Sequence, residues 1–376
     1  MKKVLYVATV ASHICQFHLP YLEMFQSMGY KTHVAARDNL AEKNGLSLNF
    51  TDKYFDIPFQ RSPKDKRNIK AYKELKKVID SNKYDLIVCN TPMGGVLTRI
   101  AARKARNTGT RVIYIAHGFH FYRGAPKKYW LTFFPIEKMF AKLCDMVITI
   151  NEEDYICAKK HFKTDVRHIH GIGVKTERYY PVDALTKKEL RTALNLTDDN
   201  FVILCTGELN KNKNQEQLIK AANILKNKIS GLKILFAGNG PNEENLRKLI
   251  TDLNLNDNIK LLGYRTDLEK IVPAVDLIVS CSRREGLGLN VIEGMLCKKT
   301  VVATKNRGHC ELIKNDFNGY LVSIGNFEEM ADCIYNIYFD MEKANLFAKN
   351  SKELAQNYTV NFVKEELTNI LGLKKE

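Results

Sequence analysis

Two carboxylates eight positions apart, Glu285 and Glu293, stand on either side of a short segment that contains Gly286 and Gly288. Glycines at such positions let backbone N–H groups approach a ligand closely. If a helix begins there, its N-terminus favours an anion such as a pyrophosphate. A carboxylate about one turn inside that helix, as Glu293 would be, can accept both hydroxyls of a ribose. The spacing therefore predicts a site for a nucleotide diphosphate with a further group attached.

The flanking sequence supplies the strand and the helix that this site needs. Asp276–Ser280 is a short β-branched run typical of a buried parallel strand. Downstream, Leu289 and Ile292 recur at helical spacing. An alternative interpretation stays open, in which Glu293 only complements the helix dipole and Glu285 is a solvated loop residue.

The segment from Glu285 to Glu293, which reads Glu-Gly-Leu-Gly-Leu-Asn-Val-Ile-Glu, resembles the E-x7-E signature of the family 4 retaining glycosyltransferases, which have the GT-B fold. The resemblance covers essentially the whole chain. It implies that Glu285 stands beside the transferred sugar and acts in catalysis. The donor-binding residues that it implies within this segment are Gly286, Leu287, Gly288, Leu289 and Glu293.

Length and composition fit a two-domain cytoplasmic protein. The chain has 376 residues, of which 45% are apolar, and this is enough for two packed cores. No run of about eighteen apolar residues occurs, and the N-terminus reads as a first strand rather than a signal peptide. The nine cysteines are odd in number and form no C-x-x-C pair, which favours a reduced cytoplasm.

The net charge of +16 indicates an anionic partner, whether nucleic acid, membrane surface or phosphate-bearing substrate. Tyr122–Phe134 interleaves cations with the only tryptophan, Trp130, and with other aromatics, a combination that suits an anionic lipid interface. We therefore predict peripheral attachment to the inner face of the plasma membrane. In the alternative, Trp130, Phe133 and Phe134 are packed core, because they also recur at helical spacing.

Strand-like runs alternate with helical segments in both halves, which predicts an α/β protein with two doubly wound, Rossmann-like domains. In the first half the predicted strands are Val4–Val10, Thr32–Ala36, Leu86–Asn90, Val112–His117 and Met146–Ile150. In the second half they are Val202–Gly207, Lys233–Gly238, Ile259–Gly263, Leu277–Ser282, Val301–Thr304 and Gly319–Val322. We predict an acceptor-binding domain over 1–172 and a nucleotide-sugar-binding domain over 173–352. The resemblance implies that a helix within 353–376 returns to the first domain.

Gly207–Asn214 follows a predicted strand and opens a predicted helix, so Lys211 and Lys213 can reach a diphosphate near that helix N-terminus. The segment is similar to the family's G-R-L-x-x-x-K-G element, and this similarity gives Lys213 the position of the phosphate-binding lysine. Glu208 stands where many members have arginine, which leaves Lys213 or Lys211 to neutralise the phosphates. Alternatively, both lysines are solvated residues at a helix start.

His117 ends a predicted strand at the ligand edge of the first domain and is followed by glycine. It matches a family histidine that contacts the donor sugar near the reacting carbon, so we expect a catalytic role rather than that of a satisfied core histidine. The segment from Ser12 to His18 replaces the glycine-rich first loop of many relatives. The residues expected on the acceptor side are Ser12, His13, His18 and His120.

Gly238, Asn239 and Arg265 lie in loops that end predicted strands of the second domain, where the family holds the nucleotide base. His168 and His170 point to one face of a short strand without a third ligand nearby, so we predict no metal there. No D-x-D sequence occurs, so the signature of Mg²⁺- or Mn²⁺-dependent transferases is absent and we expect no metal and no other cofactor. The leaving diphosphate must then be neutralised by lysine, helix N-termini and backbone amides.

The leading hypothesis is a retaining, metal-independent hexosyltransferase that uses a nucleoside-diphosphate donor, expected to be a UDP-sugar. As the resemblance implies, its acceptor is a polyprenyl-diphosphate-linked sugar or an oligosaccharide in capsule or exopolysaccharide synthesis. A nucleotide-sugar 2-epimerase shares the two-domain fold and is the alternative enzyme. A basic nucleic-acid-binding protein would also explain the charge, but the paired glutamates argue against it, and we expect no nucleic acid partner.

Overall fold

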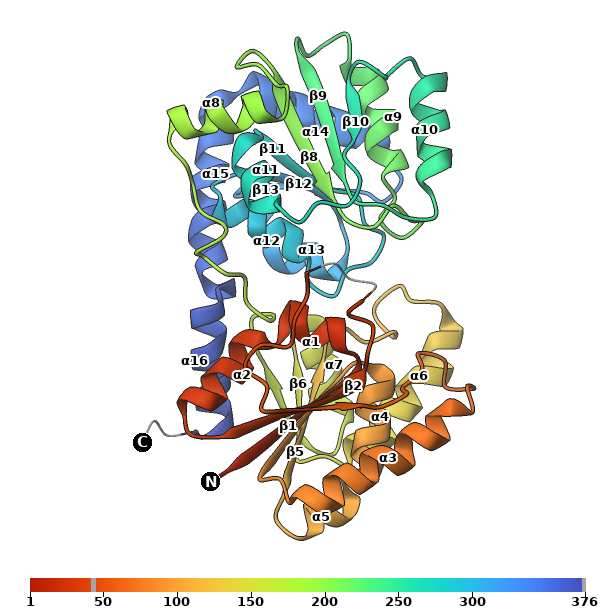
Figure 1. The fold of residues 1–376 in the computed structure, drawn as a ribbon. Coiled ribbons are helices and arrows are strands. Elements are labelled where there is room, and N and C mark those ends of the chain that lie inside the picture. The colour runs from red at the N-terminus through yellow and green to blue at the C-terminus, as the bar shows by residue number, and fades with distance from the viewer. Residues whose placement is uncertain (42–44, 374–376) are drawn as a thin grey trace. The chain divides into compact units, whose positions relative to one another are not determined.

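The computed structural model describes residues 1–41 and 45–373, which divide into two compact units (Figure 1). Unit 1 comprises Met1–Gly173 and the segment from Val360 onward, and unit 2 comprises Val174–Thr359. The first boundary lies beside the one predicted after residue 172. The second lies at 360 rather than 353, because α15 (Met341–Ala355) runs through the predicted start of the returning helix and η1 (Gln356–Tyr358) follows it.

Unit 1 is built on a parallel, 7-stranded sheet in the order β3-β2-β1-β4-β5-β6-β7. Its strands are β1 (Lys3–Val10), β2 (Lys31–Arg37), β3 (Lys53–Asp56), β4 (Leu86–Asn90), β5 (Arg111–Ala116), β6 (Met146–Thr149) and β7 (Asp165–His168). Its helices are α1 (Ala11–Phe17), α2 (Leu19–Ser27), α3 (Arg67–Asn82), α4 (Pro92–Ala101), α5 (Arg103–Asn107), α6 (Lys127–Ala141), α7 (Glu152–His161) and α16 (Val360–Leu371).

The central strands of unit 1 are buried along nearly their whole length, as expected for a parallel sheet covered by helices. Their apolar runs explain why the predicted strands match the observed ones closely. Two strands escaped prediction, β3 and β7, because they are short and carry charged residues. The expected first loop is also different: Ser12–Phe17 belongs to α1, which begins directly after β1.

Helix α16 completes unit 1 although it comes after unit 2 in the chain, and it lies beside α2 (Figure 1). Val363, Leu367 and Leu371 are buried. Glu366 Oε1 lies 2.7 Å from His170 Nδ1. Gly173 permits the approach of this segment, because a Cβ atom there would lie 2.6 Å from the Val360 Cα.

Unit 2 holds a parallel, 6-stranded sheet in the order β10-β9-β8-β11-β12-β13. Its strands are β8 (Phe201–Thr206), β9 (Leu232–Ala237), β10 (Ile259–Leu261), β11 (Leu277–Ser280), β12 (Thr300–Thr304) and β13 (Gly319–Val322). Its other helices are α8 (Ala184–Ala193), α9 (Glu216–Leu225), α10 (Glu243–Asp252), α11 (Leu268–Ala274), α12 (Leu289–Leu296), α13 (Arg307–Leu312) and α14 (Phe327–Phe339).

Each sheet has a point where the strand order reverses. In unit 1 it lies between β1 and β4, and in unit 2 between β8 and β11. Open α/β sheets bind ligands beyond the carboxyl ends of the strands at such a point. The segments that leave β8 and β11 carry Lys213 and Glu285, and those that leave β1 and β4 carry His13 and Thr91. The topology therefore marks one candidate region in each unit.

The aromatic segment Tyr122–Phe134 leads into α6 and packs inward. Trp130, Phe133 and Phe134 lie against the hydrophobic core of unit 1, and Trp130 Nε1 donates to the Tyr122 carbonyl at 3.2 Å. The three rings are thus partly buried against the core, which agrees with the packed-core alternative, and their entry into a lipid interface stays a prediction. The exposed apolar residues of α6 are instead Leu131, Ile136 and Met139. Among the described residues, no helix is both long and apolar enough to cross a bilayer.

Candidate active site

Lys213 and Glu285 meet at the reversal point of unit 2, where Lys213 Nζ donates to Glu285 Oε1 at 2.5 Å. Both side chains keep partial exposure, 24% for the lysine and 15% for the glutamate. Burial raises the pKa of Glu285, but Lys213, Ser282 and His309 outweigh it and hold that pKa below the ordinary value. The glutamate is therefore ionised at neutral pH. Contrary to prediction, Lys213 does not open a helix, because α9 begins only at Glu216.

The glycine turn after Glu285 leads directly into α12. Gly288 is the N-cap residue with φ 108°, a backbone conformation that favours glycine. A Cβ atom at Gly288 would lie 3.3 Å from the His309 ring, so that ring packs against the turn. Leu287 is buried and Leu289 is the first helical residue, which leaves Gly286 and the backbone of the turn to meet a ligand. The predicted strand, turn and helix are all present.

Glu293 lies one turn inside α12 and interacts with Tyr179 and Arg178, two residues that the sequence analysis did not assign to the site. Burial raises the pKa of its carboxyl to about 7, although a hydrogen bond from Tyr179 and the charge of Arg178 act in the opposite direction. Arg178 in turn forms an ion pair with Glu269 at 2.6 Å. A carboxyl group with this pKa is only partly ionised at neutral pH, and further hydrogen-bond donors would favour its ionised form. Ribose hydroxyls are donors of that kind.

The loops after β8 and β9 touch each other backbone to backbone. A Cβ atom at Gly238 would lie 2.0 Å from the carbonyl oxygen of Gly207, so neither loop has space for a side chain there. Asn239 accepts a backbone hydrogen bond from Leu209 at 2.9 Å. Arg265 is held in its own loop by Asp267, at 2.6 and 2.8 Å. These residues line the carboxyl edge of the sheet, but their predicted contacts with a nucleotide stay predictions.

Lys211 and Glu208 differ from Lys213 in their surroundings. Lys211 is exposed and lines a recess of about 810 Å³ together with Asn212 and Arg283. Glu208 is exposed and accepts from Asn210 Nδ2 at 2.8 Å. Of the two lysines considered for the diphosphate, Lys213 is the one that the structure joins to the predicted catalytic glutamate.

In unit 1, the candidate residues fall into a buried group and a cavity-lining group. The rings of His13, His18 and His117 lie together in edge-to-face and tilted arrangements, with ring-centroid separations of 4.6, 5.2 and 5.3 Å. Burial lowers the pKa of all three, that of His117 to about 4, so they are neutral at pH 7. His117 Nε2 also lies 3.2 Å from Asn90 Oδ1. The predicted contact of His117 with a donor sugar stays a prediction.

Two residues predicted on the acceptor side, Ser12 and His18, are buried and are not among the residues that line the cavity described next. Ser12 is buried, and both its backbone N–H and its hydroxyl are bonded to the amide of Asn39. His18 is completely buried, because it caps the junction of α1 and α2 inside the unit. Ser12 lies within α1 and His18 directly follows it, so the expected open loop is helical, and the place of these two residues on the acceptor side stays a prediction. His13 and His120 do line the cavity described next.

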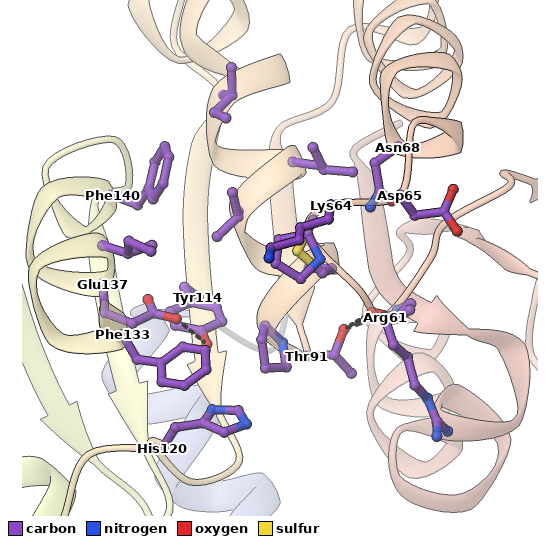
Figure 2. Close-up of a pocket in the computed structure, with 18 of the residues that line it drawn as sticks. Arg61, Lys64, Asp65, Asn68, Thr91, Tyr114, His120, Phe133, Glu137 and Phe140 are labelled. Atoms are coloured by element: carbon purple, nitrogen blue, oxygen red, sulfur yellow. Dashed lines mark hydrogen bonds between the residues drawn. The ribbon is translucent and has the colours of Figure 1, made fainter. Parts of the chain in front are cut away.

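A cavity of about 1000 Å³ opens in unit 1 beside α6 (Figure 2). Its wall is largely apolar, with Phe133 and Phe140 on one side. Glu137 points into this wall, where it accepts from the Tyr114 hydroxyl at 3.3 Å and from Arg99 Nη2 at 2.8 Å. Three exposed cations, Arg61, Lys64 and Lys66, also line this cavity. An apolar interior beside cations suits a ligand with a hydrocarbon part and an anionic part.

Sequence reasoning missed three contributors to the unit 2 site. Tyr179 and Arg178 belong to the segment before α8 and interact with Glu293. They are more than 100 residues away from it in the sequence, so no short-range spacing pattern predicts this interaction. His309 was detectable in principle, because Gly308-His309 follows strand β12 at the same sheet edge. A Cβ atom at Gly308 would lie 2.7 Å from the Leu287 carbonyl, so α13 packs closely on the glycine turn.

Comparison with known proteins gives matches over both units. Residues 186–354 match the family described as Glycosyl transferases group 1, and residues 3–151 match Glycosyl transferase 4-like. The Putative glycosyltransferase EpsD of Bacillus subtilis is 43% identical over 372 residues, 98% of this chain and 96% of the relative. The UDP-Gal:alpha-D-GlcNAc-diphosphoundecaprenol alpha-1,3-galactosyltransferase of Escherichia coli is 29% identical over 307 residues, 77% of each chain.

Solved structures share the architecture. Anabaena HepE in complex with UDP has a TM-score of 0.79 at 22% identity, covering 99% of this chain and 100% of that chain. The glycosyltransferase WaaG, described as involved in lipopolysaccharide biosynthesis, has a TM-score of 0.76 at 14% identity, covering all of both chains. The predicted fold class of two Rossmann-like α/β domains is therefore confirmed.

Proposed function

The chain belongs to the group 1 glycosyltransferases and has the GT-B fold, and from this premise we propose that it is a retaining UDP-sugar transferase of exopolysaccharide or capsule synthesis. The acceptor that we propose is a hydroxyl of a sugar carried on polyprenyl diphosphate, or of a growing oligosaccharide. Two relatives support these choices. HepE has been solved with UDP and with UDP-glucose, and the E. coli relative is named for UDP-Gal and a diphosphoundecaprenol acceptor.

The observation that carries the proposal is the Lys213–Glu285 pair beside the glycine turn of α12. A diphosphate placed at this turn would receive backbone N–H groups and the positive end of the helix dipole. Its negative charge would also compete with Glu285 for the Lys213 ammonium, which is partly exposed and able to move. Glu285 would then be released toward the sugar that the diphosphate carries. Glu293, one turn further along, supplies the acceptor for ribose hydroxyls.

In the proposed reaction, the bond between the sugar and the diphosphate oxygen breaks while the acceptor hydroxyl attacks the same face of the sugar. The acceptor proton goes to the departing phosphate, so no enzymatic base is required. Lys213 and the amides of the glycine turn stabilise the negative charge that develops on the diphosphate. Because the chain contains no D-x-D sequence, we propose that this step needs no Mg²⁺ or Mn²⁺ at the diphosphate.

The cavity of unit 1 supports a lipid-linked acceptor. Its apolar wall can bury part of a polyprenyl chain, at roughly 25 cal/mol for each Å² removed from water. The exposed cations Arg61, Lys64 and Lys66 stand where they can meet a diphosphate. The outer surface of α6, which carries exposed Leu131 and Met139 between lysines, would hold the protein reversibly on an anionic membrane that contains this acceptor.

A donor panel tests the proposal. UDP-, GDP- and ADP-sugars would be compared by thermal shift, and UDP-sugars are expected to raise the melting temperature most. Glu293→Ala should weaken UDP binding in calorimetry by about 1–3 kcal/mol, the loss expected for a charged hydrogen bond. Exposed Glu328→Ala is the matched control. Unchanged UDP affinity in Glu293→Ala would remove this residue from the site, and formation of an epimerised nucleotide sugar without acceptor would favour the 2-epimerase.

Chelation tests the proposed chemistry at the diphosphate. Turnover measured shortly after the addition of excess EDTA should equal turnover measured with added Mg²⁺ or Mn²⁺. The reason is that Lys213 and the helix N-terminus supply the positive charge that those ions supply elsewhere. Activity that disappears with EDTA and returns on addition of manganese would contradict this part of the proposal.

A further inference from the structure

Three histidines of unit 1 converge on one point in its interior. His13 lies on α1, His18 joins α1 to α2, and His117 follows β5. One ring nitrogen of each lies within 4.8 Å of a ring nitrogen of the other two. In residues 1–41 and 45–373, this is the one group of three or more histidine, cysteine or carboxylate side chains with ligand atoms so close together.

The nitrogens of this cluster lack the partners that buried imidazoles normally have. His18 is completely buried, and neither its Nδ1 nor its Nε2 has a hydrogen-bond partner in the part of the chain that the structure describes. The Nε2 of His13 is buried and unpartnered as well. Buried side-chain nitrogens are almost always hydrogen-bonded, since an unmet donor or acceptor in the interior is destabilising. Three such nitrogens at one point therefore indicate a missing partner.

We propose that His13, His18 and His117 form a binding site for a transition-metal ion of the zinc class. Zinc binds imidazole nitrogen at about 2.0–2.1 Å, so three tetrahedral ligands place their ring centroids roughly 5 Å apart. The observed separations of 4.6, 5.2 and 5.3 Å match this value. The ligand nitrogens lie within 4.8 Å of one another and would have to approach to about 3.4 Å around a bound ion.

The donor set also selects among metals. A site made of imidazoles without carboxylates suits Zn²⁺, Co²⁺, Ni²⁺ or Cu²⁺, whereas Mg²⁺ and Mn²⁺ prefer oxygen ligands. Asn90 Oδ1, at 3.2 Å from His117 Nε2, can accept a hydrogen bond that fixes this ring, as outer partners of metal-bound histidines do. Three protein ligands leave a fourth position for water or another oxygen. His13 lines the unit 1 cavity, so this position can be reached from there.

This site differs from the proposed diphosphate site in its residues, since all its ligands are imidazoles of unit 1. It also does not depend on the proposed activity, because zinc binding can be measured without any nucleotide sugar. Loss of metal binding and loss of sugar transfer are therefore distinguishable results.

The test uses the full chain without a histidine tag, stripped of metal by dialysis against dipicolinate. Calorimetry with Zn²⁺ should give one ion for each chain, and Zn²⁺ should raise the melting temperature. His13→Gln and His117→Gln should each weaken zinc binding by more than about 100-fold, a larger loss than changes to the hydrogen-bond partners of metal ligands cause. His161→Gln, in the same unit but outside the cluster, is the matched control and should bind as the wild type does. Asn90→Ala should lose about 10- to 100-fold.

A cobalt spectrum keeps the proposal testable if a variant fails to fold. Wild-type protein with one equivalent of Co²⁺ should show visible d–d bands of a tetrahedral nitrogen site and no thiolate charge-transfer band. Strong thiolate absorption would assign the metal to cysteines and overturn the proposal. Absence of stoichiometric Zn²⁺ binding, or zinc affinity unchanged in folded His13→Gln and His117→Gln, would overturn it as well.

Discussion

The Arg99–Glu137 pair of unit 1 and the Lys213–Glu285 pair of unit 2 both lie close to a candidate ligand region, but the two pairs are built differently. In unit 1, Arg99 meets Glu137 at 2.8 Å and is completely buried. Arg99 Nε also donates to the Gly95 carbonyl, and its guanidinium stacks on Tyr114 at 4.0 Å. This pair is fixed by contacts on several sides.

In unit 2, the side chains of Lys213 and Glu285 are 24% and 15% exposed to solvent. The lysine ammonium is bonded to the Glu285 carboxylate. A lysine is a flexible point charge, whereas an arginine is a planar group that holds several bonds at once. The comparison indicates that the Arg99 pair supports the packing around the cavity, while the Lys213 pair holds two reactive groups in place until a ligand separates them. A buried pair should then act on stability and an accessible pair on activity.

Breaking the buried pair should have the largest effect. Arg99→Met leaves the Glu137 carboxylate without its partner, and we expect a loss of about 3–5 kcal/mol in the free energy of unfolding of unit 1. The single tryptophan, Trp130, packs in this unit, so its fluorescence during urea unfolding measures the change. The double variant Arg99→Met with Glu137→Met should recover much of the loss. Equal stability of the single variant and wild type would contradict the structural role.

Removing the accessible cation should lower activity with little change in stability. Lys213→Ala is expected to reduce kcat/KM by about 100- to 1000-fold, as loss of a charge-stabilising group does. Lys211→Ala, two residues away and exposed, is the matched control and should stay close to wild type. Steady-state kinetics and thermal melts on the same preparations measure both properties. If Lys211→Ala lost as much activity as Lys213→Ala, the assignment of the phosphate-binding lysine would be wrong.

Glu293 should make the stability of unit 2 depend on pH. The pKa of this residue is raised to about 7 in the folded state from an ordinary value of 4.5, so the folded protein binds the proton more tightly than the unfolded chain. Its contribution to stability is therefore greatest at low pH and is lost as pH rises from about 4.5 through 7. Glu293→Gln should remove this dependence, on the order of 2–3 kcal/mol across the window. Urea unfolding followed by circular dichroism at several pH values measures this dependence. A profile for Glu293→Gln as steep as that of the wild type would contradict the prediction.

The smallest expected effect is on membrane binding through the exposed face of α6. Each of Lys128 and Lys138 should contribute about 1 kcal/mol to binding on anionic vesicles at low salt, and the contribution should fade as ionic strength rises. Leu131→Ser with Met139→Ser should weaken sedimentation with such vesicles without unfolding the protein, because both residues are exposed. Binding to neutral vesicles that equals binding to anionic ones would mean that the cations serve a dissolved substrate.

The sequence predicts the sheets well and the side-chain environments poorly. Strands such as Leu86–Asn90 and Gly319–Val322 have the predicted bounds, because their apolar composition is a local property. The glycine turn between Glu285 and Glu293 was also predictable, since its function needs adjacent residues. The environments of Ser12, His18 and Trp130 were not, because burial depends on neighbours that are distant in the chain. For the same reason no pattern revealed that Tyr179 would reach Glu293.

The discontinuity of unit 1 has a consequence for how the protein is made. Its sheet is translated first, but α16 emerges from the ribosome only after all of unit 2. Domains usually fold in the order of synthesis. Here the second unit can be complete while the first still lacks the helix that carries Val363, Leu367 and Leu371. Until α16 has been synthesised, the residues of unit 1 that pack against Val363, Leu367 and Leu371 lack this cover, and chaperones would recognise the chain at this stage.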